Sequence, residues 1–168
     1  KYTGVMGKNN INVFIFYDAE THPKEKLFWT ERVDSLLEVM KAMPDVNMEY
    51  YDWLHGQACL SHAMILMTEK KPDEAAKYYE QFLQTSYGKE DDGRYNSVSY
   101  LEANGRYDEI ADIYQNYDSY SENIGREMSL EHIINGLFTK FHFNYYAGRK
   151  DTAMAVILRI DSLIQPTT

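Results

Sequence analysis

Apolar residues recur every three or four positions through most of the chain, a spacing that places their side chains on one face of an α-helix. The first apolar stripe begins after Pro23, ends before Pro44 and predicts a helix; it consists of Leu27, Phe28, Val33, Leu36, Leu37 and Met40. Further helices are predicted over residues 48–68, 72–88, 108–120, 129–147 and 151–164, and a shorter apolar pattern precedes residue 104. The pattern therefore predicts an all-α protein.

Single residues mark where these helices begin and end. Pro23 and Pro72 suit the first helical position, because the amide that proline lacks has no intrahelical partner there. Ser129 can cap a helix through its hydroxyl group. Gly105 suits the left-handed residue that commonly follows a helix end.

Three segments do not show the helical pattern. Residues 89–93 are predicted to form a charged loop, and residues 121–127 form the longest polar connection. The short apolar run at residues 13–17 fits either a buried helix turn or a strand, because its length does not distinguish the two.

The turns between helices repeat a similar sequence. Residues 69–75, 104–110 and 147–153 each combine a short polar turn with an Asp and a final small or aliphatic residue, and these final residues lie 35 and 43 positions apart. A bulky residue follows four positions later in each case, at Tyr79, Tyr114 and Ile157. This arrangement resembles the tetratricopeptide repeat, a helix-turn-helix unit of about 34 residues.

The resemblance covers residues 52–164 and implies a right-handed solenoid of antiparallel helix hairpins, about four pairs in all. The Trp, Gly and Tyr expected in the first helix of a repeat are mostly absent, with Ala63, Val98 and Phe141 at the position usually given to a small residue. The longer interval requires an insertion within residues 118–128. We expect a single domain over residues 1–168 that belongs to a larger protein. The alternative architecture is an irregular helical bundle.

Composition excludes several classes of partner. Seventeen Lys and Arg residues against 26 Asp and Glu leave a net charge of −9, so no nucleic acid is expected to bind. The apolar fraction of 44% is too high for a disordered acidic chain. No apolar run approaches the roughly 20 residues of a membrane-spanning helix, so no membrane insertion is expected.

Residue types that perform catalysis or hold metals occur without the neighbours that this chemistry requires. His55 and His62 lie two helical turns apart, but no acidic residue or second Cys completes a metal-binding spacing. The single cysteine, Cys59, lies in an apolar helix and is predicted to be a buried, inert thiol. We predict no catalytic residue, no cofactor and no metal. A small helical enzyme remains a lesser alternative that lacks convergent titratable groups.

In a tetratricopeptide array, the first helix of each repeat lines the concave face. The resemblance therefore places ten residues in one groove, namely Gln57, Leu60, Met64, Tyr95, Ser99, Glu102, Asn135, Phe138, His142 and Tyr145. Their apolar, aromatic and polar mixture suits an extended peptide or a partner helix better than an anionic ligand. The tyrosine pairs at positions 50–51, 78–79 and 145–146 are expected to bury one ring and leave its neighbour accessible.

The Tyr-rich helices and the turn at residues 104–109 also resemble the tetratricopeptide-like N-terminal regions of histidine kinase sensor proteins from Bacteroidetes. This resemblance implies a non-catalytic sensing or protein-binding module of a two-component signalling protein. The expected partner is a protein or peptide, and a second copy of the chain is one candidate. The resemblance also favours an extracytoplasmic location and leaves a cytoplasmic one open. The alternative function is self-association through an interface that covers Tyr95, His142 and Tyr145.

Overall fold

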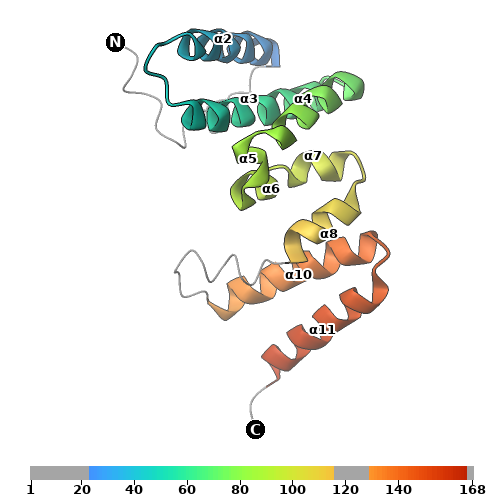
Figure 1. The fold of residues 1–168 in the computed structure, drawn as a ribbon. Coiled ribbons are helices and arrows are strands. Elements are labelled where there is room, and N and C mark those ends of the chain that lie inside the picture. Colours follow the sequence, from blue (N-terminus) through green and yellow to red (C-terminus); the bar gives the residue numbers. More distant parts are fainter. Residues whose placement is uncertain (1–22, 116–128, 166–168) are drawn as a thin grey trace. The chain divides into compact units, whose positions relative to one another are not determined.

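The structure, a computed structural model, describes residues 23–115 and 129–165. Every element in these two ranges is a helix, which confirms the all-α class (Figure 1). The helices are α2 (Pro23–Lys41), α3 (Met48–Thr68), α4 (Pro72–Gln84), α5 (Ser86–Lys89), α6 (Asp91–Asn96), α7 (Val98–Ala103), α8 (Tyr107–Gln115), α10 (Leu130–Tyr146) and α11 (Lys150–Ile164). The predictions for residues 13–17, 118–128 and 121–127 lie outside the described ranges.

Several helix boundaries follow from the local sequence. The helix predicted over residues 48–68 is α3, and Asn47 caps it by accepting a hydrogen bond from the Tyr50 amide at 3.1 Å. Ser129 caps α10, because its hydroxyl accepts from the His132 amide at 3.3 Å. These caps satisfy amides that have no partner within the first turn of a helix.

The three turns that the sequence pattern aligned have the same backbone geometry. Lys70, Gly105 and Gly148 adopt positive φ values of 61°, 66° and 75°. The following amides, of Lys71, Arg106 and Arg149, donate to the carbonyls of Leu66, Leu101 and Asn144, each at 2.9 Å. This is the bonding that closes a helix end around a left-handed residue. The turn is therefore a true structural repeat, and the solenoid arrangement of the helices stays a prediction.

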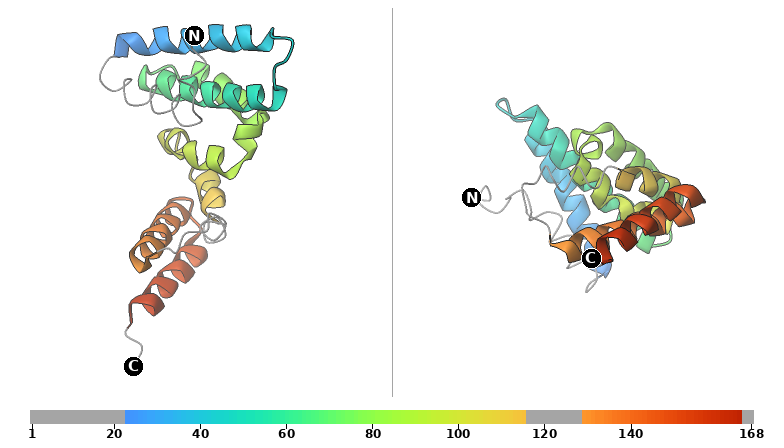
Figure 2. Two further views of the ribbon diagram at one scale, coloured as in Figure 1. Left: turned by 90° about the vertical axis from the view of Figure 1, so that its left-hand side faces the viewer. Right: turned by 90° about the horizontal axis from the view of Figure 1, so that it is seen from below.

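The chain forms two compact units, Lys1–Tyr100 and Leu101–Thr168. In the first unit, α3 is the central helix and contacts α2, α4 and α5 (Figure 1, Figure 2). Leu37 of α2 is buried together with Tyr51, Leu54 and Ala58 of α3. Because three helices cover α3, its buried residues lie on most of its circumference.

The helix predicted over residues 72–88 begins at Pro72 as expected but is not continuous to residue 88, and the loop predicted over residues 89–93 is wrong. Helix α4 ends at Gln84, Thr85 adopts an extended conformation, and two short helices, α5 and α6, follow. The Thr85 hydroxyl accepts from the Gly88 amide at 3.2 Å, and the Asp52 carboxylate accepts from the Ser86 amide at 2.6 Å. The second bond comes from α3, so the break depends on a tertiary contact that local patterning does not contain.

The core of the second unit lies between α10 and α11. Leu137 of α10 is buried with Val156 and Ile160 of α11. The guanidinium of Arg149, at the start of α11, pairs with Asp108 at 3.1 Å and with Asp112 at 2.6 Å, both on α8. No helix in the described part of the chain is long and apolar enough to cross a membrane.

Candidate binding surface

Helix α10 has one buried face and one exposed aromatic face. Its inner side carries Leu137, Phe143 and Asn144, which are buried. Its outer side carries Asn135, Phe138, His142 and Tyr145, all four of them exposed, at steps of three, four and three residues. These steps keep the four side chains on one face. The structure thus brings together the four α10 residues that were predicted to line a groove.

The aromatic rings on this face are large and accessible. Phe138 is 47% exposed and Tyr145 is 58% exposed. Solvent-exposed aromatic side chains of this kind are enriched where proteins bind other proteins, because they bury much area with few rotatable bonds. We call Asn135, Phe138, His142 and Tyr145 the α10 face.

Two further tyrosines extend the α10 face at its C-terminal end. The ring of Tyr146 lies 4.5 Å from the ring of His142 and 5.2 Å from the ring of Tyr107, which begins α8. Tyr145 contacts the ring of Phe141 at 6.0 Å. Tyr107 was not among the predicted groove residues. Only the tertiary contact with Tyr146 places it beside the α10 face.

The predicted groove residues on α3 are less accessible. Gln57 is 3% exposed and Leu60 is 2% exposed, so the assignment of these two residues to an open groove is corrected. Met64, one turn further on, is half-buried. The physical reason is the covering of α3 by three neighbouring helices, one of which, α5, was not predicted.

The three middle groove residues lie on two short helices. Tyr95 is half-buried on α6, whereas Ser99 and Glu102 are exposed on α7. Ser97 ends α6, and its hydroxyl donates to the Arg94 carbonyl at 2.8 Å. The tetratricopeptide resemblance requires one helix to carry all three residues, but no single continuous helix carries them.

The tyrosine pairs behave in two ways. Tyr51 and Tyr79 are buried, and their neighbours Tyr50 and Tyr78 are half-buried, as predicted. The pair at positions 145–146 is different, because both rings are exposed. This difference singles out the C-terminal end of α10 as the most accessible tyrosine surface of the three.

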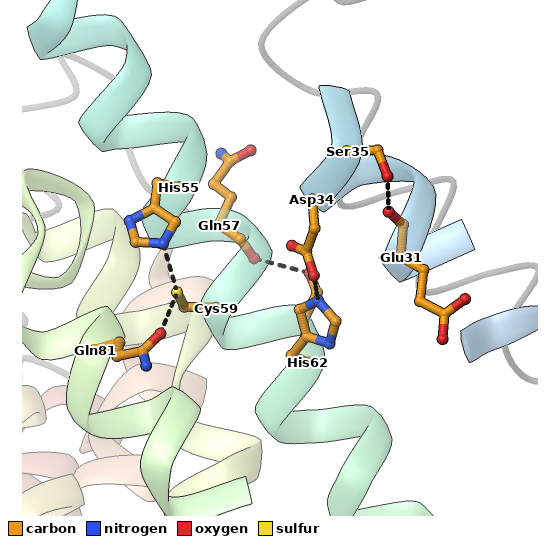
Figure 3. A network of polar contacts seen from close by, with 9 residues as sticks. Glu31, Asp34, Ser35, His55, Gln57, Cys59, His62 and Gln81 are labelled. Atoms are coloured by element: carbon orange, nitrogen blue, oxygen red, sulfur yellow. Dashed lines mark hydrogen bonds and ion pairs between the residues drawn. The ribbon is translucent and has the colours of Figure 1, made fainter. Parts of the chain in front are cut away.

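A polar cluster joins α2, α3 and α4 in the first unit (Figure 3). Nε2 of His62 lies 2.9 Å from a carboxylate oxygen of Asp34, and the His62 ring stacks on Tyr78 with centroids 4.4 Å apart. His55 contacts a different group, the sulfur of Cys59, at 3.5 Å. The two histidines therefore have separate partners, and His62 is buried whereas His55 is half-buried.

Cys59 has the environment of an unreactive thiol. It is buried, and its sulfur lies 3.7 Å from Oε1 of Gln81. Burial, together with the negative charges of Asp34 and Asp52, raises the pKa of the thiol to about 12. Because the thiolate is the nucleophilic form, this cysteine is held in its inert form at neutral pH.

Among the side chains that the structure describes, no three His, Cys, Asp or Glu groups lie close enough together to hold a metal ion. No protein-family model, no curated protein and no solved structure matches the chain.

Proposed function

We propose that this chain is a non-catalytic module that binds a protein or peptide segment through the α10 face. The observation that carries the proposal is the exposure of Phe138 and Tyr145 on one side of a helix whose other side is firmly packed. A rigid helix that presents aromatic side chains can bind a partner with little ordering cost.

The partner that suits this face is an extended peptide with apolar anchors and a net positive charge. The aromatic rings would contact the apolar anchors, and their faces attract ammonium and guanidinium groups. The chain itself carries a net charge of −9, which favours a basic partner over an acidic one.

Selection from a random peptide library displayed on phage tests this proposal. We expect enrichment of peptides that combine apolar and basic residues. Binding of a selected peptide, measured by fluorescence anisotropy, should weaken at least about tenfold in Tyr145→Ala and in Phe138→Ala, as for central aromatic residues of an interface. Leu158→Ala is the matched control, because Leu158 is an exposed apolar residue on α11.

Two outcomes would contradict the proposal. One is the absence of any enriched peptide. The other is a selected peptide whose affinity is the same in the two α10 variants as in the control variant. A tight dimer whose interface covers His142 and Tyr145, seen by hydrogen exchange, would replace peptide binding with the self-association alternative.

The resemblance to sensor regions of histidine kinases supports a cellular setting for this module. In that setting, binding at the α10 face would change the signalling state of a longer two-component protein. A solenoid would suit such a role, because small rotations between neighbouring repeats add along the array. Kinase activity of the longer protein should then respond to a selected peptide, and this response should be lost in Tyr145→Ala.

A further inference from the structure

A hollow lies at the turn that joins α2 to α3 in the first unit (Figure 1). Its volume is about 420 Å³, within the range of about 300–1,000 Å³ that is typical of small-molecule sites. The hollow is lined by Met40, Met43, Pro44, Asp45, Val46, Asn47 and Tyr50. All seven residues belong to the turn and to the helix ends beside it. The hollow is therefore a compact bowl, which suits a small molecule better than an extended chain.

Most of the lining is apolar. Met40, Val46 and Tyr50 are half-buried, and Met43 is exposed. The ring of Tyr50 stacks on the ring of Trp53, with centroids 6.3 Å apart and planes 10° apart. Methionine side chains are flexible and polarizable, and their sulfur atoms make favourable contacts with aromatic rings. The lining can therefore hold a flat aromatic group against the two methionines and Tyr50.

Backbone bonds hold the turn in one shape. The Met43 amide donates to the Met40 carbonyl at 3.1 Å, and the Val46 amide donates to the Met43 carbonyl at 3.4 Å. Pro44, between these bonds, has a fixed φ angle. A site that is already formed binds its ligand with a smaller ordering cost.

The two polar residues of the lining differ in what they can still bind. Oδ1 of Asn47 already accepts from the Tyr50 amide at 3.1 Å. Asp45 is exposed, and within the described part of the chain its carboxylate has no ion-pair or hydrogen-bond partner. Lys41, the nearest basic residue in the sequence, places its Nζ 5.9 Å from the ring centroid of Tyr51 instead. An unpaired carboxylate beside an apolar lining attracts a cation.

We propose that this hollow binds a small aromatic amine. The ring lies against Met40, Met43 and Tyr50, and the ammonium group lies beside the Asp45 carboxylate. The net charge of −9 also favours a cationic ligand. Because the hollow is partly open to solvent, binding is weak, with a dissociation constant of about 1–10 mM. The hollow and the α10 face lie in different units, so either proposal can fail without the other.

Three small ligands of similar shape test the chemistry of the hollow. Phenethylamine, phenethyl alcohol and hydrocinnamate carry a positive charge, no charge and a negative charge at the end of the same ring and linker. Binding is measured by NMR on the isotope-labelled methyl groups of Met40 and Met43. The amine should bind about two- to fivefold more tightly than the alcohol, the effect of an exposed ion pair. The acid should bind more weakly than the alcohol.

Variants separate the charge of Asp45 from the apolar lining. Asp45→Asn should reduce the affinity for the amine to that for the alcohol and leave the affinity for the alcohol unchanged. Glu80→Gln, which removes an equal charge from an exposed position on α4, is the matched control and should bind the amine as the wild type does. Met43→Ala should weaken the binding of all three ligands at least about twofold, because it removes apolar contact area.

The proposal is overturned if the methyl resonances of Met40 and Met43 do not shift with up to about 20 mM phenethylamine. It is also overturned if the acid binds as tightly as the amine. Equal effects of Asp45→Asn and Glu80→Gln would likewise refute it, because net charge alone would then explain the preference for the amine. Shifts confined to other methionines would place the amine elsewhere and would refute binding at the hollow.

Discussion

Replacing Gly56 by Ala tests how closely α5 packs on α3. A Cβ atom at position 56 would overlap the hydroxyl oxygen of Thr85 and would lie 2.9 Å from Cβ of Tyr87 and 3.0 Å from Cβ of Thr85. Thr85 cannot move freely, because its hydroxyl donates to the Phe82 carbonyl at 2.6 Å and accepts from the Gly88 amide. The added methyl group therefore meets a fixed part of the structure.

Three contributions set the expected change in the free energy of unfolding. Alanine is favoured over glycine in a helix interior by about 1 kcal/mol. Overpacking of a closely packed site costs about 1–3 kcal/mol. Displacement of Thr85 would also weaken two hydrogen bonds that contribute about 1 kcal/mol each. The sum predicts that Gly56→Ala lowers the free energy of unfolding by about 2–4 kcal/mol.

Urea unfolding followed by circular dichroism measures this change. The double variant Gly56→Ala with Thr85→Ala removes the hydroxyl that the new methyl group would meet. Its loss of stability should therefore be smaller than the sum of the two single losses. A Gly56→Ala variant as stable as the wild type, or more stable, would refute the close packing of α5 on α3.

Three further predictions concern single side chains. Because the folded state holds the pKa of the Cys59 thiol at about 12, above its ordinary value of 9.0, the unfolded chain ionises first, and stability should decline as the pH rises above about 9. Cys59→Ala should remove this part of the pH dependence, and an unchanged profile would show that the thiol is not buried in solution. Phe82→Ala should lower the free energy of unfolding by about 3–5 kcal/mol, because Phe82 is fully buried; a loss below about 1 kcal/mol in thermal unfolding would contradict this burial. Arg149→Ala should cost at most about 1 kcal/mol, because its ion pairs with two aspartates of α8 are exposed, and this cost should shrink in high salt; a larger, salt-independent loss would point to a packing role.

Much of the secondary structure follows from the sequence alone. The bounds of α3 and the starts of α2 and α4 follow from apolar spacing and from Pro23 and Pro72. The left-handed residue at Gly105 and the cap at Ser129 were also predictable. All of these features depend on interactions within a few residues, such as capping bonds, allowed φ values and helical period.

The candidate binding surface was predictable only in part. Asn135, Phe138, His142 and Tyr145 share an exposed face because their spacing fits one side of a long helix. Gln57 and Leu60 have equally suitable spacing, but they are buried. Spacing determines which residues share a face of a helix, and it does not determine whether a neighbouring helix covers that face.

The chain's own sequence determined that it is helical, where most helices begin, and that three turns share one pattern, because these properties arise from local hydrogen bonds and side-chain period. Tertiary structure alone decided that α4 breaks at Thr85, where Asp52 lies 34 positions away from the amide that it binds. It also decided that Leu37 faces the core while Val39 faces solvent on the same apolar helix. Contacts between residues distant in sequence select one apolar face for burial, and the face left over is the one that remains available for binding.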